Sequence, residues 1–137
     1  MIDEKMWEEV LAAIPKEEPT EMPAELGTVD GNRVLAVDGD RLKTQADKKG
    51  DNKPHMDFVE GDNDAECDFV RREFGKKVLL IDDKMDFEDW PFILYHEAHE
   101  RRSMSRGMSY DKAHMLANAG EKLLRIRSRA EKLRSQP

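Results

Sequence analysis

Cysteine is almost absent from this chain of 137 residues, in which Cys67 is the single example. One cysteine cannot form an internal disulfide, so we expect no covalent cross-link and a reducing compartment. Long hydrophobic runs are also missing: no stretch could span a bilayer, and the charged N-terminus leads into no apolar signal segment. The sequence therefore predicts a soluble, cytoplasmic protein without a membrane partner.

Apolar residues are scarce relative to charged ones. They make up 38% of the chain and charged residues 39%, which is poorer in core material and richer in charge than an average globular protein. A chain of this length is most simply one small domain with extensions. We find no internal repeat.

Acidic residues predominate, but unevenly. Residues 1–90 carry 25 acids against 13 bases, whereas residues 91–137 carry 5 acids against 10 bases. The net charge of −7 argues against general nucleic-acid binding. The late bases form a cluster that either contacts a phosphate or an acidic partner or is a solvated helix end: Arg125, Arg127, Arg129, Lys132 and Arg134.

The first 31 residues predict a short helix and a linker. Apolar residues recur at helical spacing over residues 3–14, and Pro15, Pro19 and Pro23 end the pattern. We interpret residues 1–31 as an amphipathic helix followed by an acidic, proline-containing linker. The helix docks either on the main domain or on a partner.

Short β-like runs follow from Asn32. Residues 33–37 predict a strand, Asp38 and Gly39 a turn, and residues 41–44 a return strand. A polar loop is expected over residues 46–54. Apolar residues then predict further strands, at Met56, Phe58, Cys67, Phe69, Val70 and residues 78–81. Because the connections look too short for helical crossovers, we expect an antiparallel sheet.

Two helices are predicted after the last strand. The first begins around Pro91 and ends at Gly107, a residue typical of left-handed helix ends. Ser109 can cap the second helix, which runs towards Arg134. The fold class is therefore α+β: a small antiparallel sheet over residues 33–82 packed on a helical hairpin over about 91–133, with residues 32–134 forming one domain.

The first of these helices carries the sequence His96-Glu97-Ala98-His99-Glu100. Helical spacing places His96, Glu97 and Glu100 on one face together with apolar residues, whereas His99 lies off that face. Carboxylates in such surroundings are costly to bury unless they are paired, protonated or bound to a cation. The pattern favours a metal site.

The hairpin would add a third ligand. Its short turn brings His114 level with Glu100, while His96 and Glu100 are one turn apart on the first helix. Two histidines and one carboxylate with an open position are typical of catalytic zinc sites. Glu97 is then a candidate general base, and Tyr110 could stabilise an oxyanion.

Other interpretations of the same residues remain open. They could form a buried hydrogen-bonded network or lie on a solvated face. His99 is the substitute if Glu100 is not a ligand, and His55 is expected to be only a loop histidine. Glu121 lies further along the second helix than His114, so we expect it to brace His96 across the hairpin.

In the order and spacing of these motifs, the sequence resembles a group of small bacterial and phage proteins that are similar to zincin-like metallopeptidases. The resemblance covers roughly residues 33–125 and depends on His96-Glu97-Ala98-His99-Glu100, on Tyr110-Asp111-Lys112-Ala113-His114, and on upstream segments such as Val37-Asp38-Gly39. It implies a minimal core of a strand followed by the active-site helix. The usual peptidase pattern is His-Glu-x-x-His, and here Glu100 stands in place of the second histidine.

These observations predict a zinc-dependent hydrolase in which metal-activated water attacks a peptide carbonyl, with a peptide or protein as substrate. A phage or another mobile element could encode it. The alternative is a non-enzymatic acidic binding or inhibitor protein. In that protein the histidine cluster would be a structural metal site or a buried network of histidine and glutamate.

Overall fold

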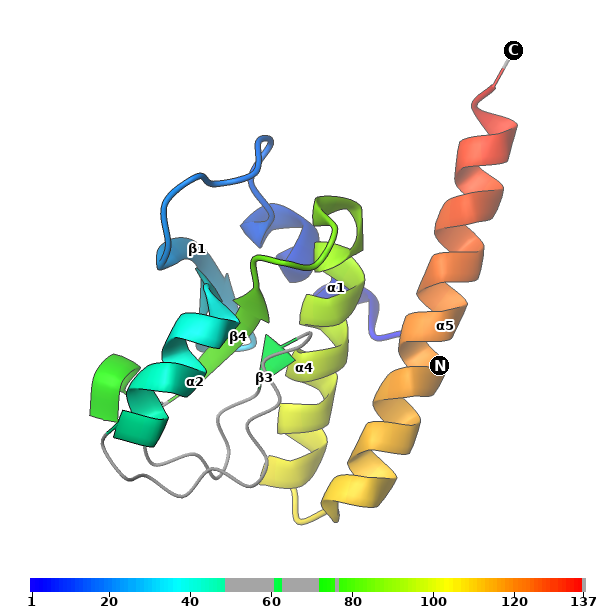
Figure 1. Cartoon of the computed structure of the whole chain (residues 1–137). Helices are drawn as coiled ribbons and strands as arrows, with labels where there is room; N and C mark the ends of the chain where they lie inside the picture. Colours follow the sequence, from blue (N-terminus) through cyan, green and yellow to red (C-terminus); the bar gives the residue numbers. More distant parts are fainter. Residues whose placement is uncertain (49–60, 63–71, 76, 137) are drawn as a thin grey trace.

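The computed structural model describes residues 1–48, 61–62, 72–75 and 77–136. A four-stranded sheet has the order β1-β2-β4-β3, formed by β1 Ala24–Val29, β2 Asn32–Val37, β3 Gly61–Asp62 and β4 Val78–Asp82. The helices are α1 Glu4–Ala13, α2 Gly39–Lys48, α4 Trp90–Ser105 and α5 Tyr110–Arg134, with a short 3-10 turn, η1 Phe87–Asp89, before α4 (Figure 1). The α+β class expected from the sequence is confirmed.

The sheet is mixed, so the expectation of a wholly antiparallel sheet was wrong. β1 and β3 run antiparallel to their neighbours, but β2 pairs with β4 in parallel, with Arg33 aligned to Val78 and Val37 to Asp82. A parallel pair requires a long crossover connection. The chain between β2 and β4 spans residues 38–77 and includes α2, which leaves ample length for that crossover.

The return strand expected at residues 41–44 was also wrong, because these residues belong to α2. The Asp38 side chain accepts a hydrogen bond from the Arg41 N–H, and the Asp38 carbonyl accepts one from the Leu42 N–H. This closes a helical turn where a hairpin turn was expected. Leu42 and Ala46, four residues apart, are both buried, so the helical period satisfies the apolar residues better than strand alternation would.

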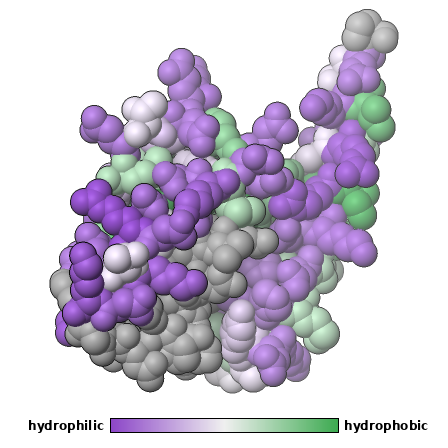
Figure 2. Space-filling model, viewed as in Figure 1, coloured by the Kyte–Doolittle hydropathy of each residue, from purple (hydrophilic) through white to green (hydrophobic). Residues whose placement is uncertain are grey.

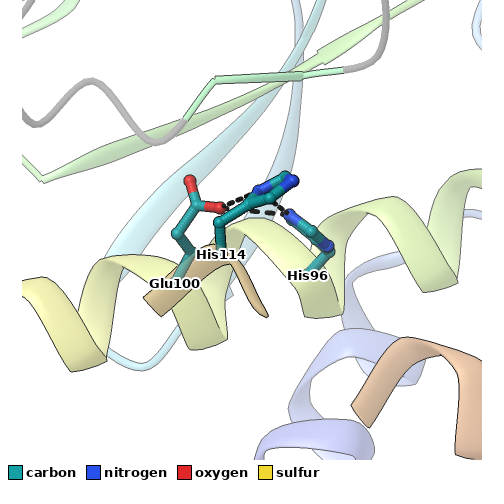
Figure 3. Close-up of side chains that lie close together, drawn as sticks. All are labelled: His96, Glu100 and His114. Atoms are coloured by element: carbon teal, nitrogen blue, oxygen red, sulfur yellow. Dashed lines mark hydrogen bonds and ion pairs between the residues drawn. The ribbon is translucent and has the colours of Figure 1, made fainter. Parts of the chain in front are cut away.

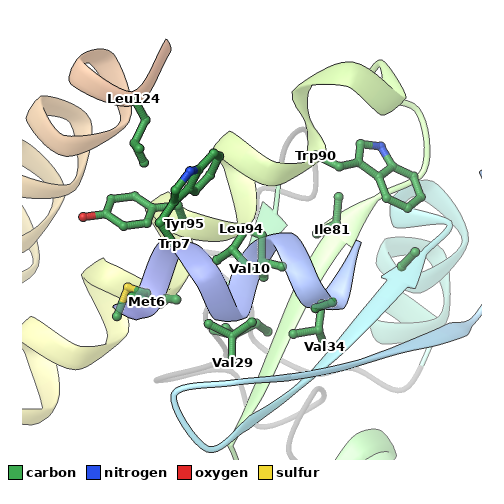
Figure 4. Close-up of a cluster of buried hydrophobic side chains, with 14 residues drawn as sticks. Met6, Trp7, Val10, Val29, Val34, Ile81, Trp90, Leu94, Tyr95 and Leu124 are labelled. Carbon is green, nitrogen blue, oxygen red and sulfur yellow. The ribbon is translucent and has the colours of Figure 1, made fainter. Parts of the chain in front are cut away.

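Helices cover both faces of the sheet. Alternate residues of β2 and β4 point to opposite sides. On one side Leu35, Val37, Val78 and Leu80 pack with α2, while on the other Val34, Ala36, Leu79 and Ile81 pack with α1 and α4 (Figure 4). β4 is buried along its whole length, as expected of a strand covered on both faces. The strand predicted at residues 78–81 is thus a central strand of the sheet.

The N-terminal helix docks on the main domain. Met6, Trp7 and Val10 of α1 are buried in the larger core, and the Trp7 ring stacks on Phe92 with centroids 5.6 Å apart. Residues 24–29, expected to be linker, form β1 and pair with β2. The domain boundary expected between residues 31 and 32 therefore lies at the turn between two paired strands, β1 and β2.

The helical hairpin follows the sequence expectation closely. Gly107 has a φ of 93°, and the N–H groups of Gly107 and Met108 donate to the carbonyls of Met104 and Ser103, a Schellman arrangement that ends α4. The Ser109 hydroxyl accepts from the Lys112 N–H and begins α5. With so short a turn α4 and α5 lie side by side and antiparallel (Figure 1).

The polar loop expected over residues 46–54 was wrong at its start, because residues 46–48 belong to α2. Some expectations fall outside the described residues: the strands around Met56, Phe58, Cys67, Phe69 and Val70, the rest of that loop over residues 49–54, and the loop position of His55. Among the described helices, none combines the length and the apolar character that crossing a membrane requires.

Candidate metal centre

The middle of α4 buries acidic and basic side chains. His96, Glu97 and Glu100 are only 7%, 8% and 4% exposed. The same helix contributes Leu94, Tyr95 and other apolar residues to the core, so the polar groups are held inside by the packing of their neighbours. Buried carboxylates and imidazoles need partners or a cation to offset the loss of water.

Three donor atoms converge at the α4–α5 contact (Figure 3). His96 Nε2 lies 3.1 Å from Glu100 Oε2 and 3.2 Å from His114 Nδ1, and His114 Nδ1 lies 2.8 Å from the same carboxylate oxygen. The helical spacing of the first two residues and the short hairpin turn together produce this triangle. These three residues could hold a metal ion, since their ligand atoms all lie within 4.8 Å of one another.

Protons alone cannot satisfy all three contacts of this triangle. An imidazole nitrogen is either an N–H donor or a lone-pair acceptor, never both. If both histidines donate to Glu100 Oε2, two N–H groups face each other across the contact between His96 and His114. If either nitrogen lacks its proton, another contact loses its hydrogen bond. A cation at the centre would attract all three lone pairs at once.

The spacing of the donors also suits a metal ion. Zinc binds imidazole nitrogen and carboxylate oxygen at about 2.0–2.2 Å in tetrahedral sites, which places neighbouring donor atoms roughly 3.3 Å apart. The observed separations of 2.8 to 3.2 Å are only slightly shorter. Small rotations of the side chains would therefore open the triangle to the required size, and the residues present fit such an ion.

Electrostatics in the site favour charged forms. Burial opposes protonation of His96, but its contacts with Glu100 and Glu121 and the charge of Glu97 outweigh burial and raise its pKa to about 10. Burial likewise disfavours the charged form of Glu100, yet hydrogen bonds from His96 and His114 lower its pKa. Such strongly perturbed groups are concentrated at functional sites more often than elsewhere.

Behind His96 lies a second row of charged residues. His96 Nδ1 is 3.1 Å from Glu121 Oε1, without the alignment of a formal hydrogen bond, so Glu121 reaches His96 across the hairpin. Arg125 Nε lies 3.0 Å from the other oxygen of Glu121, and Arg125 Nη1 lies 2.8 Å from Asp89 Oδ1. A carboxylate beside the second ring nitrogen is what commonly orients metal-binding histidines. Arg125, one of the late bases expected to face solvent or a partner, is thus held at the hairpin, and its i, i+4 spacing from Glu121 is the sequence signal for this contact.

The other candidates surround the triangle differently. Glu97 follows His96 in the sequence, and its side chain is buried. Tyr110 begins α5, is about half exposed, and its ring centroid lies 5.4 Å from that of His114. His99 is not part of the metal-compatible cluster and instead lies with its ring centroid 5.7 Å from that of Tyr95.

Comparisons with protein-family models, with curated proteins and with solved structures gave no match. The resemblance to zincin-like metallopeptidases therefore stays a prediction from the sequence, and a function must be inferred from the geometry of the site.

Proposed function

We propose that the protein is a zinc-dependent hydrolase that cleaves peptide bonds, with His96, Glu100 and His114 as the metal ligands. The observation that carries the proposal is the convergence of two imidazole nitrogens and one carboxylate oxygen on a single point. Zinc is the metal of choice because it accepts nitrogen and oxygen donors in tetrahedral geometry and keeps an open position when the protein supplies only three ligands.

Access from solvent supports a catalytic site over a closed structural one. His96 and Glu100 are buried, whereas the His114 side chain is 44% exposed. Structural zinc sites take all four ligands from the protein, and catalytic sites leave one position free. Water and substrate would enter from the side of His114.

The residues then divide the work of hydrolysis. When bound, zinc would act as a Lewis acid and lower the pKa of a water molecule to near neutral. The Glu97 carboxylate accepts the proton of the attacking water and returns it to the nitrogen of the leaving amine as the C–N bond breaks. The Tyr110 hydroxyl donates to the oxygen that gains negative charge. Glu121 holds His96 in the orientation that directs Nε2 into the site.

A second candidate has its own supporting observation. His96 already contacts Glu100 and Glu121, so a protonated histidine between two carboxylates could stabilise the α4–α5 pair without metal. The protein would then be an acidic binding or inhibitor protein with a buried network. Metal content separates the metal centre from this network, and zinc-dependent cleavage separates a hydrolase from a binding protein with a structural metal site.

The activity is tested with a mixed peptide library incubated with zinc-loaded protein. Glu97→Gln keeps the size of the side chain but cannot accept a proton, so turnover should fall about 100-fold or more while zinc stays bound. Glu131→Gln on α5 is the matched control and should cleave as the wild type does, and a chelated sample should be inactive. Equal cleavage by wild type and Glu97→Gln would remove Glu97 from the mechanism, and absence of any zinc-dependent cleavage would favour the binding-protein candidate.

A further inference from the structure

The C-terminal half of α5 extends beyond the rest of the molecule (Figure 1). The helix contributes Leu124 to the core, but no later residue belongs to either described core cluster. In Figure 2 apolar side chains lie on the outer side of this projecting part, between hydrophilic ones. α5 continues for ten residues past Leu124, its last core residue. Packing in the core therefore does not explain the apolar residues in this last part of the helix.

An apolar stripe runs along α5 on a different face from its core contacts. Its members alternate in steps of three and four residues, which is the pattern of the a and d positions of a coiled coil: Leu116, Ala119, Leu123, Ile126, Ala130 and Leu133. The residues that pack on α4 lie roughly 120° away around the helix. Ile126 is 57% exposed and Leu133 is 63% exposed, so the stripe is open to solvent.

Basic residues flank the stripe on both sides. Lys122 and Arg129 occupy the g positions, and Arg127 and Arg134 occupy the e positions. Arg127 pairs with Glu4, whereas within the described part of the chain no ion pair holds Lys122, Arg129 or Arg134. Residues at e and g face the partner helix and select it by charge.

This charge pattern discriminates between occupants. A second copy of α5 would place bases opposite bases, since parallel packing opposes g and e positions and antiparallel packing opposes like positions. A nucleic acid would use the bases but would leave the apolar stripe uncovered. A helix with apolar a and d residues and acidic e and g residues would match both features.

We propose that the face of α5 from Leu116 to Leu133 is a docking site for an acidic amphipathic helix of another protein. The contact is short, at about two and a half heptads, so the complex is weak and salt-dependent. Because α5 is already folded and anchored at its N-terminal half, only the partner must become ordered on binding, which favours association.

The probe is a synthetic peptide of three heptads with Leu and Ile at a and d and Glu at e and g, and its counterpart has Lys at e and g. Binding of fluorescently labelled peptide to the full chain is followed by anisotropy. We expect the Glu peptide to bind at least ten-fold more tightly than the Lys peptide, and its affinity to fall as salt rises. Ile126→Glu should abolish binding, and the charge-reversed pair K122E/R129E should remove the preference for the Glu peptide, because the two new acids offset Arg127 and Arg134.

Lys132→Glu is the matched control, since it changes the same charge on a face away from the stripe, and it should retain the preference for the Glu peptide. Circular dichroism confirms that each variant is folded, and Ile126→Glu is exposed enough to be tolerated. Failure of both peptides to bind, equal binding of both, or a wild-type dimer in sedimentation that Ile126→Glu dissociates would each overturn the proposal. Because none of these readouts involves metal or cleavage, the test is independent of the proposed hydrolase.

Discussion

At the scale of single residues, the site depends on which side chain of α4 completes the triangle with His96 and His114. Glu100 Oε2 contacts both histidine nitrogens, whereas His99 faces Tyr95. Loss of groups outside the ligand set typically weakens metal binding 10- to 100-fold. Glu100→Gln should therefore weaken zinc binding more than about 100-fold, and the matched variant His99→Gln should leave it nearly unchanged. Competition with a chromophoric chelator measures both, and the opposite order would make His99 the ligand.

The protonation of His96 gives the metal-free protein a characteristic pH dependence. Its pKa is raised to about 10 in the folded protein, against about 6.5 in an unfolded chain. Protonated His96 thus stabilises the fold fully below about pH 6.5, and this contribution is lost as the pH rises through about 10. The melting temperature of metal-free protein should fall between pH 6.5 and pH 9.5.

His96→Gln is the control for this prediction, because it keeps a polar side chain that does not titrate. Its melting temperature should change less over the same range. Zinc requires the unprotonated nitrogen, so added zinc should stabilise the wild type more at pH 9 than at pH 6. A wild-type curve parallel to that of His96→Gln would contradict the assignment of the raised pKa to His96.

At the scale of elements, the distance between α4 and α5 decides whether His114 reaches His96. Gly120 of α5 lies against Tyr95, and a Cβ at this position would be 3.0 Å from Tyr95 Cε1. Tyr95 is fully buried, and its hydroxyl accepts a hydrogen bond from the Asp3 N–H, so it cannot easily move. The absence of a side chain at Gly120 therefore allows α5 to lie close to α4.

Gly120→Ala tests this closeness. Alanine gains up to about 1 kcal/mol in helix propensity, but overpacking in a core costs about 1–3 kcal/mol. We expect a net loss of roughly 1 kcal/mol in the free energy of unfolding, together with weaker zinc binding. Asn118→Ala, exposed on the same helix, should be neutral or slightly stabilising. Urea denaturation decides, and a stabilised Gly120→Ala protein would show that the contact is not tight.

The elements differ in how far the sequence alone could predict them. α4 and α5 have strong local signals: Pro91 near the start of α4, Gly107 and Ser109 between the two helices, and apolar residues at helical spacing over a long stretch. The metal candidates followed from the same signals, because i, i+4 spacing and a short turn are local features. The Schellman geometry at Gly107 confirms that local chemistry was sufficient there.

The elements that were missed depend on distant partners. Residues 24–29 look like linker between Pro23 and the turn at Asp30, and they become a strand because β2 offers a pairing edge. Residues 39–48 begin with Gly39, which suggested a turn, and they become helical because Leu42 and Ala46 find the open face of the sheet. The parallel pairing of β2 and β4 could be predicted only if the connection through α2 were recognised as a crossover.

At the scale of the whole molecule, α1 is part of the core: it packs against α4, and its Glu4 pairs with Arg127 of α5. Trp7 packs between Phe92 and Tyr95, and Arg102 of α4 pairs with both Asp3 and Asp30. The N-terminal segment, the β1–β2 turn and the helix that carries the metal candidates are thereby joined. Loss of α1 packing should loosen the site as well as the fold.

Trp7→Ala tests this dependence. Truncating a large buried aromatic side chain costs about 3–5 kcal/mol of stability. Leu11→Ala on the same helix is the control, because Leu11 is 50% exposed and should cost far less. Denaturant unfolding at equilibrium compares the two. Similar losses for both variants would mean that α1 is only loosely attached.

Metal content shows whether His96, Glu100 and His114 form a metal centre. Protein purified without added metal, then equilibrated with zinc and desalted, is analysed by elemental mass spectrometry together with His114→Ala and the control His99→Gln. We predict one zinc per chain for the wild type and for His99→Gln, and almost none for His114→Ala. Absence of zinc from the wild type, or equal zinc in the wild type and His114→Ala, would contradict the metal centre.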